Sequence, residues 1–140
     1  MLQRLPGAIL FFSHKSYSCH ARAHLRRAAA QARVDPSRLI FLERAESRGG
    51  YLSFVSGCDL LLDTPLFNAQ TTAVDFLWAN VAILTLPSGR WVGRVGASLA
   101  RACGTPTSVI VARDESDYRR LGMALASRAA LLVRPRAQSP

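Results

Sequence analysis

The sequence has little lysine, few cysteines and no long apolar run. Lysine occurs once, at Lys15, so arginine supplies the other 17 of the 18 basic residues. The cysteines are odd in number and widely spaced, which argues against a disulfide framework or zinc ribbon and fits a reducing compartment. We interpret all of them as small buried residues: Cys19, Cys58 and Cys103. No apolar run approaches the roughly 20 residues of a transmembrane helix, so we expect no membrane partner.

Acidic residues are also scarce, at 9 against 18 basic ones, and the net charge is +9. Such a charge suits a nucleic acid, but the arginines are scattered and no binding motif accompanies them, so this partner class ranks third. The first 34 residues hold no acid, which is compatible with an organellar transit peptide. We favour a core strand at Ala8–Phe12 and expect the cytoplasm or nucleus, with organellar targeting as the alternative.

Short apolar segments alternate with helical patterns along the chain, and 49% hydrophobic content is enough for one globular domain. The predicted strands are Ala8–Phe12, Arg38–Leu42, Leu60–Asp63, Val81–Thr85 and Ser108–Ala112. The predicted helices are His20–Val34, Tyr51–Gly57, Thr71–Asn80, Trp91–Cys103 and Ser116–Ser127. This alternation predicts an α/β fold with a Rossmann-like parallel sheet and helices on both faces. In such sheets ligands bind beyond the carboxyl ends of the strands.

One stretch, Asp59–Ala79, combines a strand, a turn-rich loop and the start of a helix. The N–H groups and positive dipole end of that helix would form an anion site, to which the hydroxyls of Thr71 and Thr72 add donors. Asp75, one turn further, could accept a hydrogen bond from a sugar hydroxyl. The competing interpretation is that Thr71 only caps the helix and Asp75 favours its first turn. Arg48 and an aromatic ring could face the same pocket.

The block Leu62–Ala79, followed by Thr85–Pro87 and Arg94–Ser98, closely resembles the protein O-GlcNAc transferase family. Weaker resemblance extends from about Leu2 to Ala126. The resemblance implies that the chain is the C-terminal Rossmann-like lobe of a two-lobed, GT-B type glycosyltransferase, truncated at both ends. That lobe binds UDP-GlcNAc without a cofactor or metal, and the enzyme inverts the sugar as it transfers it to a protein Ser or Thr.

The resemblance also implies a set of donor-binding residues. Thr71 and Thr72 match a pair that binds the diphosphate, and Asp75 matches a carboxylate on the ribose. Arg48 stands near a basic residue beside the ribose, and Tyr51 where the family has a ring packed on the uracil. The sequence departs from the family at two further positions. Gln70 stands where histidine is common, so it could donate to phosphate without carrying charge, and Phe54 stands where arginine is common.

The family's diphosphate-binding lysine, with a glutamine before it, lies upstream of the segment that Leu2–Pro6 matches, so we assign no catalytic residue. The same resemblance implies that the chain lacks two further parts of the enzyme. These are the first strand, which is central in the usual doubly wound order, and the N-terminal lobe. We therefore expect residues 1–128 to be a partial domain and 129–140 a frayed basic tail. A donor-binding lobe that acts on protein acceptors once completed is the first hypothesis. A non-catalytic fragment or interaction module is the second.

Three other features have simpler interpretations. Lys15 could substitute for the missing lysine, but a lone lysine in a loop is usually solvated. His20 and His24 lie beside Cys19 at metal-ligand spacing, but no further ligand is at hand, so we interpret them as helix surface. Trp78 and Trp91 are interpreted as core or rim packing.

Overall fold

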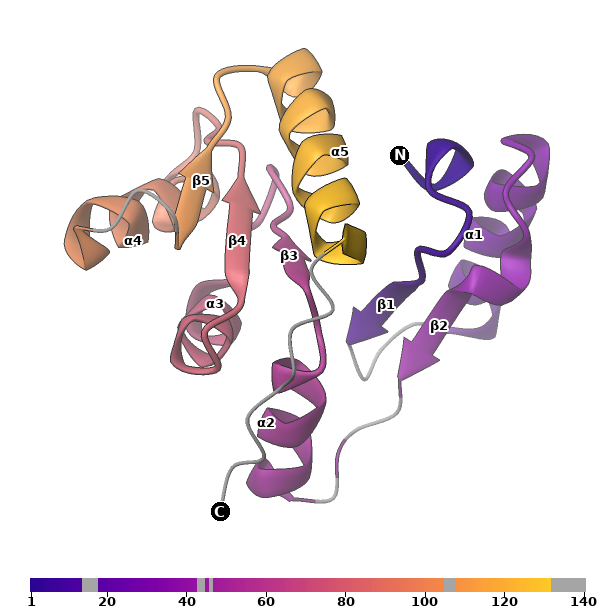
Figure 1. Cartoon of the computed structure of the whole chain (residues 1–140), viewed down its shortest axis with the longest axis horizontal. Helices are drawn as coiled ribbons and strands as arrows, with labels where there is room; N and C mark the ends of the chain where they lie inside the picture. Colours follow the sequence, from indigo (N-terminus) through magenta and orange to yellow (C-terminus); the bar gives the residue numbers. More distant parts are fainter. Residues whose placement is uncertain (14–17, 43–44, 46, 105–107, 132–140) are drawn as a thin grey trace. The chain divides into compact units, whose positions relative to one another are not determined.

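The computed structural model describes residues 1–13, 18–42, 45, 47–104 and 108–131. The chain separates into two compact units, Met1–Tyr51 and Leu52–Pro140. All five predicted strands are present, and each sheet that they form is parallel (Figure 1). The α/β class is therefore confirmed, while the single partial domain over residues 1–128 stays a prediction. None of the helices in the described ranges is long and apolar enough to cross a membrane.

The first unit is built around a two-stranded sheet. Its elements in chain order are η1 (Leu2–Arg4), β1 (Leu10–Ser13), α1 (Cys19–Gln31), η2 (Pro36–Arg38), β2 (Leu39–Leu42) and the start of α2 (Arg48–Ser56). The register pairs Phe12 with Phe41, and their rings stack with centroids 4.9 Å apart. The guanidinium groups of Arg22 and Arg26 lie 5.7 and 5.4 Å from the Phe41 ring centroid, so α1 contributes cation–π contacts to this unit.

One side chain, Arg38, ties the beginning of this unit together. Its Nε donates to the carbonyl of Ala8 at 2.8 Å, and its terminal nitrogens donate to the carbonyls of Leu2 and Leu5. These carbonyls belong to η1 and the turn after it, which have no sheet partner of their own. A guanidinium can serve several acceptors because its donors form a fixed planar fork.

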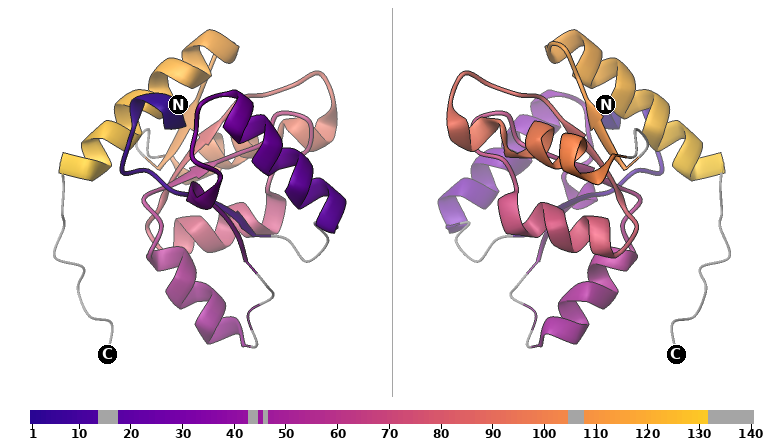
Figure 2. Two further views of the ribbon diagram at one scale, coloured as in Figure 1. Left: turned by 90° about the vertical axis from the view of Figure 1, so that its right-hand side faces the viewer. Right: turned by 90° about the vertical axis from the view of Figure 1, so that its left-hand side faces the viewer.

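The second unit holds the three-stranded sheet in the order β3–β4–β5. Its elements are the rest of α2, β3 (Leu60–Leu62), α3 (Gln70–Trp78), β4 (Ala82–Thr85), η3 (Trp91–Gly93), α4 (Val95–Cys103), β5 (Val109–Val111) and α5 (Glu115–Leu131). Helices α3 and α4 contact each other on one face of the sheet, and α5 covers the other (Figure 2). Because the strands are parallel, the loops that follow them meet at one edge.

The core of this unit lies on both sides of β4. Leu84 and Leu86 face α5, where Leu121 and Leu125 pack against them. Ile83 and Thr85 alternate with them and face the opposite way, as successive strand residues do. Ile83, Leu84 and Thr85 are each fully buried. The core of the second unit is therefore centred on β4.

Several sequence predictions are wrong in detail. The predicted helix over Trp91–Cys103 is interrupted at Arg94, giving η3 and α4. The helix predicted over Tyr51–Gly57 begins earlier, at Arg48, and ends at Ser56, while Gly104 forms the left-handed cap of α4. Helix α5 continues to Leu131, so the first residues of the expected tail are helical; residues 132–140 lie outside the described ranges.

The interpretations of cysteine and tryptophan burial also need correction. Cys19 and Cys103 are exposed and Cys58 is half-buried, because the first two lie at helix ends rather than on covered faces. Trp78 and Trp91 are 86% and 73% exposed, so neither belongs to the core. Composition indicates how many apolar residues exist, but not which of them the fold covers.

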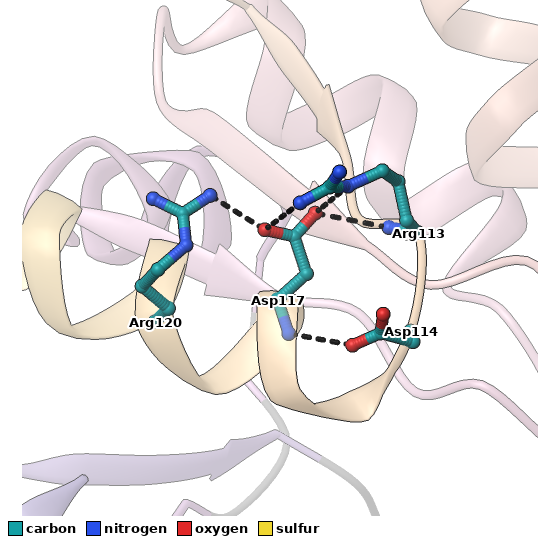
Figure 3. Close-up of polar contacts among 4 residues, drawn as sticks. All are labelled: Arg113, Asp114, Asp117 and Arg120. Carbon is teal, nitrogen blue, oxygen red and sulfur yellow. Dashed lines mark hydrogen bonds and ion pairs between the residues drawn. The ribbon is translucent and has the colours of Figure 1, made fainter.

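Asp117 anchors the junction between β5 and α5 (Figure 3). Its buried carboxylate accepts hydrogen bonds from the Nε and backbone N–H of Arg113, at 3.1 and 3.2 Å, and from Arg120. Asp114 accepts from the N–H of Asp117 at 2.8 Å and thereby caps the first turn of α5. The hydrogen bonds from Arg113 and Arg120 hold the pKa of the Asp117 carboxyl far below its usual range.

We expect Asp117→Asn to lower the melting temperature at pH 7. A carboxyl with a lowered folded-state pKa stabilises the fold above its unfolded pKa, and this contribution is lost as the pH falls through the folded value. The difference between wild type and variant should therefore shrink below about pH 4. Thermal unfolding followed by circular dichroism across this range measures it. Glu115→Gln is the control, because the Glu115–Arg119 pair is exposed on both sides and should contribute little. A pH-independent difference would contradict the assignment.

Candidate functional site

The loop between β3 and α3 carries the residues with the clearest chemistry. Helix α3 begins at Gln70, one residue earlier than predicted, and its cap is Ala69, which makes no side-chain hydrogen bond. Thr71 is therefore a residue of the first turn rather than the cap, and the capping interpretation of Thr71 is wrong. Within the described part of the chain, neither the Thr71 nor the Thr72 hydroxyl has a hydrogen-bond partner.

The backbone at this helix start offers donors to an anion. The N–H of Thr72 is used, since it donates to the carbonyl of Ala69 at 2.8 Å. For the N–H groups of Gln70 and Thr71, the described residues supply no acceptor. The positive end of the helix dipole lies at the same place. Two N–H groups and two hydroxyls can thus converge on phosphate oxygens.

Asp75 lies one turn along the same helix. It follows Thr71 at the i, i+4 spacing, which puts the two side chains on one face of α3. The side chain is half-buried. Its expected role as the acceptor of a hydrogen bond from a ribose hydroxyl stays a prediction. The structure thus brings Gln70, Thr71, Thr72 and Asp75 together.

The other two predicted donor contacts belong to the first unit. Arg48 and Tyr51 lie three residues apart in α2, on one face of that helix. Arg48 is exposed and Tyr51 is half-buried. Their expected roles beside the ribose and the uracil, in a pocket shared with α3, stay predictions. Lys15 lies outside the described residues.

Two buried polar side chains hold the loop that leads into α3. The Asp63 carboxylate accepts from the N–H of Ala69 at 2.7 Å and from the Thr85 hydroxyl at 2.7 Å. Asn68 donates from its amide to the carbonyl of Thr64 at 2.9 Å and accepts from the N–H of Gly96 at 2.9 Å. Asp63 and Asn68 are each 1% exposed. The loop is therefore fixed to both β4 and α4.

The burial of Asp63 disfavours the charged form of its carboxyl group. Burial raises the pKa of its carboxyl, while the hydrogen bonds from Thr85 and Ala69 oppose that shift. The Tyr118 hydroxyl donates to the backbone carbonyl of Asp63 at 2.9 Å. Burial, followed by the nearby Asp63 charge, raises the pKa of Tyr118 to about 12. Tyr118 therefore acts as a hydrogen-bond donor from α5 at neutral pH.

Two glycines allow this close packing, as their place in an apolar helical pattern predicts. A Cβ on Gly96 would lie 2.4 Å from the Thr85 Oγ1 and 2.8 Å from the Asp63 Oδ2. A Cβ on Gly93 would lie 2.5 Å from the carbonyl oxygen of Pro65. Both glycines therefore lie where an added side chain would clash with neighbouring residues.

Sequence reasoning missed the roles of Asp63, Asn68 and Thr85. From the sequence, Asp63 is predicted to end a strand and Asn68 to lie in the turn-rich loop that follows it. The available signal was that each is a polar residue directly after or within an apolar segment. Metal binding has no support among the described residues, where no cluster of His, Cys, Asp and Glu suited to a metal occurs. His20, His24 and Cys19 are exposed on α1.

The family model described as glycosyl transferase family 41 matches residues 1–139. The chain is 31% identical over 142 aligned residues to the UDP-N-acetylglucosamine–peptide N-acetylglucosaminyltransferase of Caenorhabditis elegans, covering 99% of the chain and 12% of that protein. It is 32% identical to the probable enzyme of the same name in Arabidopsis thaliana, covering 89% of the chain and 13% of that protein.

A solved structure is similar as well. A mutant O-GlcNAc transferase of Thermobaculum terrenum superposes with a TM-score of 0.76 at 27% identity. The match covers 94% of this chain and 25% of the bacterial one. The resemblance therefore extends over almost the whole chain but over a small part of each relative.

Proposed function

Because the chain belongs to glycosyl transferase family 41, the O-GlcNAc transferase family, we propose that its second unit binds the diphosphate and ribose of UDP-GlcNAc. The observation that carries the proposal is the start of α3, where N–H groups and hydroxyls that have no partner among the described residues lie at the positive end of a helix. Such donors suit a group that carries negative charge and many acceptor oxygens.

In this proposal each residue has a separate task. The N–H groups of Gln70 and Thr71 and the hydroxyls of Thr71 and Thr72 hold the phosphates, and the Gln70 amide adds a neutral donor. Asp75 accepts from a ribose hydroxyl. Arg48 and Tyr51 are proposed to contact the ribose and the uracil. No metal is required, because these donors already face the phosphate charge.

The residues named above bind the donor, and we assign no catalytic residue. The only carboxylate on this face of α3 is Asp75, and in this proposal it accepts a hydrogen bond from the ribose. The chain spans 12% and 13% of the two curated relatives. Transfer of GlcNAc to Ser or Thr of a protein acceptor is the activity that donor binding would serve in a complete enzyme. The free cysteines agree with a reducing compartment, and we propose the cytoplasm or nucleus.

Isothermal titration of the 140-residue chain with UDP tests donor binding directly. We expect saturable binding that uridine, which lacks the diphosphate, does not reproduce. Comparing ADP with UDP measures what the uracil contributes to affinity, because the two ligands share the diphosphate and the ribose and differ in the base. The absence of any heat of binding to UDP by a folded chain would remove the proposal.

Asp75→Ala should weaken UDP binding about tenfold, since a hydrogen bond to a charged group contributes roughly 1.5 kcal/mol. The ligand itself provides the control. UDP that lacks the ribose hydroxyl in question should bind wild type about as weakly as UDP binds the variant, and the variant should not distinguish the two ligands. The 2′-deoxy and 3′-deoxy forms identify which hydroxyl is involved. Equal discrimination by wild type and variant would exclude a ribose contact.

A further inference from the structure

The conformation of Gln70 is unusual for the residue that begins a helix. Its φ is +43°, in the left-handed region that residues other than glycine rarely adopt. A side chain held there is strained, and the strain persists only where surrounding contacts impose it. The residues directly before this strained position make the contacts that could do so. The N–H of Ala69, directly before it, is bonded to Asp63.

Asp63 is itself held in place by three hydrogen bonds to two elements, β4 and α5. Its N–H donates to the carbonyl of Leu84 at 2.9 Å, and its carbonyl accepts from Tyr118 of α5. Its Oδ2 accepts from Thr85 at the end of β4. Only Oδ1 reaches forward, across the loop, to Ala69. The carboxylate thus fixes the backbone just before α3 to the ends of β3 and β4.

Asn68 makes a second connection of the same kind. Its backbone N–H donates to the carbonyl of Val92 at 2.9 Å, and its side-chain oxygen accepts from Gly96 in α4. Two consecutive residues, Asn68 and Ala69, are therefore fixed before the chain turns at Gln70. The following N–H groups, those of Gln70 and Thr71, are the ones that the proposed site uses.

We propose that Asp63 is a positioning residue of the donor site: by bonding Ala69 and Thr85, its carboxylate holds Gln70 left-handed and aims the first N–H groups of α3 at the diphosphate. The inference rests on the proposed function, and it assigns Asp63 no contact with the ligand. A carboxylate suits this task because it can accept from both partners at once. The burial of Asp63 means that its charge is compensated by these hydrogen bonds rather than by water.

The test compares Asp63→Ala with Asp63→Asn in the 140-residue chain. Alanine removes the acceptor for Ala69. Asparagine keeps an oxygen for Ala69 and can donate its amide to the Thr85 hydroxyl, so it should restore the loop. We expect UDP affinity to fall about tenfold in Asp63→Ala and to stay within about threefold of wild type in Asp63→Asn, as for loss and retention of one charged hydrogen bond.

Amide hydrogen exchange in the absence of ligand gives a readout that global destabilisation does not reproduce. The Ala69 amide should exchange faster in Asp63→Ala than the change in global stability explains. Ile83→Val is the matched control, because it trims a fully buried residue of β4 without touching the loop. It should lower global stability and leave both the UDP affinity and the local exchange of Ala69 unchanged.

The outcomes separate the two proposals. A folded wild-type chain that fails to bind UDP overturns the proposed function, and the positioning role with it. Binding by wild type and equally tight binding by folded Asp63→Ala overturns the positioning role alone. If Asp63→Ala does not fold, Thr85→Val and Thr85→Ser decide. Valine removes the hydroxyl that holds Asp63 and should weaken UDP binding, whereas serine should restore it; equal affinities would overturn the inference.

Discussion

Replacing Gly96 with alanine is expected to lower the free energy of unfolding by about 2 kcal/mol, although alanine favours a helix interior by about 1 kcal/mol. The new Cβ would lie 2.4 Å from the Thr85 Oγ1 and 2.8 Å from the Asp63 Oδ2. Neither atom can withdraw without breaking the hydrogen bond that joins them. Overpacking at a buried site costs about 1–3 kcal/mol, and displacing a buried charged partner puts this case at the upper end.

Chemical denaturation of wild type and variant measures the effect. Gly49→Ala is the matched control, because Gly49 also lies in a helix, is exposed, and has only the Ser47 hydroxyl at 4.0 Å from an added Cβ. That substitution should be neutral or stabilising by up to about 1 kcal/mol. If Gly96→Ala were as stable as Gly49→Ala, the close approach of α4 to β4 would be wrong. UDP binding should also weaken, since Gly96 donates to the Asn68 side chain.

Changing both Thr71 and Thr72 to valine is expected to weaken UDP binding about 100-fold. Each hydroxyl that donates to a charged phosphate should contribute roughly 1.5 kcal/mol, and two such bonds give a factor of this order. Valine keeps the branched shape of threonine, so the volume of the side chains is retained. Within the described residues neither hydroxyl bonds to the protein, and the fold should lose little stability.

Calorimetry with UDP and uridine separates this effect from a general loss of structure. The double variant should lose most of the affinity that the diphosphate adds over uridine. Ser116→Ala is the control, because Ser116 is an exposed hydroxyl in the first turn of another helix, α5. It should leave UDP affinity unchanged. Full affinity in the double variant would show that these hydroxyls do not hold the phosphates.

The sequence predicted the elements well because their signals are local. Short apolar segments bounded by turn residues marked each strand, and the alternation with helices indicated parallel pairing. Helix ends were predicted less well. Thr71 was expected to begin α3, but the chain turns at Gln70 because Asp63 and Asn68 fix the residues before it. A cap imposed by tertiary contacts leaves no local sequence signal.

Residue types and their order determined the α/β class, the resemblance to the O-GlcNAc transferase family and the choice of Thr71, Thr72 and Asp75. For Thr71, Thr72 and Asp75 the spacing along one helix was sufficient, since residues three or four apart share a face. Only the tertiary structure revealed how the helix start is held. The bond between Asp63 and Thr85 joins residues 22 apart, and that between Asn68 and Gly96 joins residues 28 apart. Such pairs meet only when parallel strands and their helices pack, which no local pattern encodes.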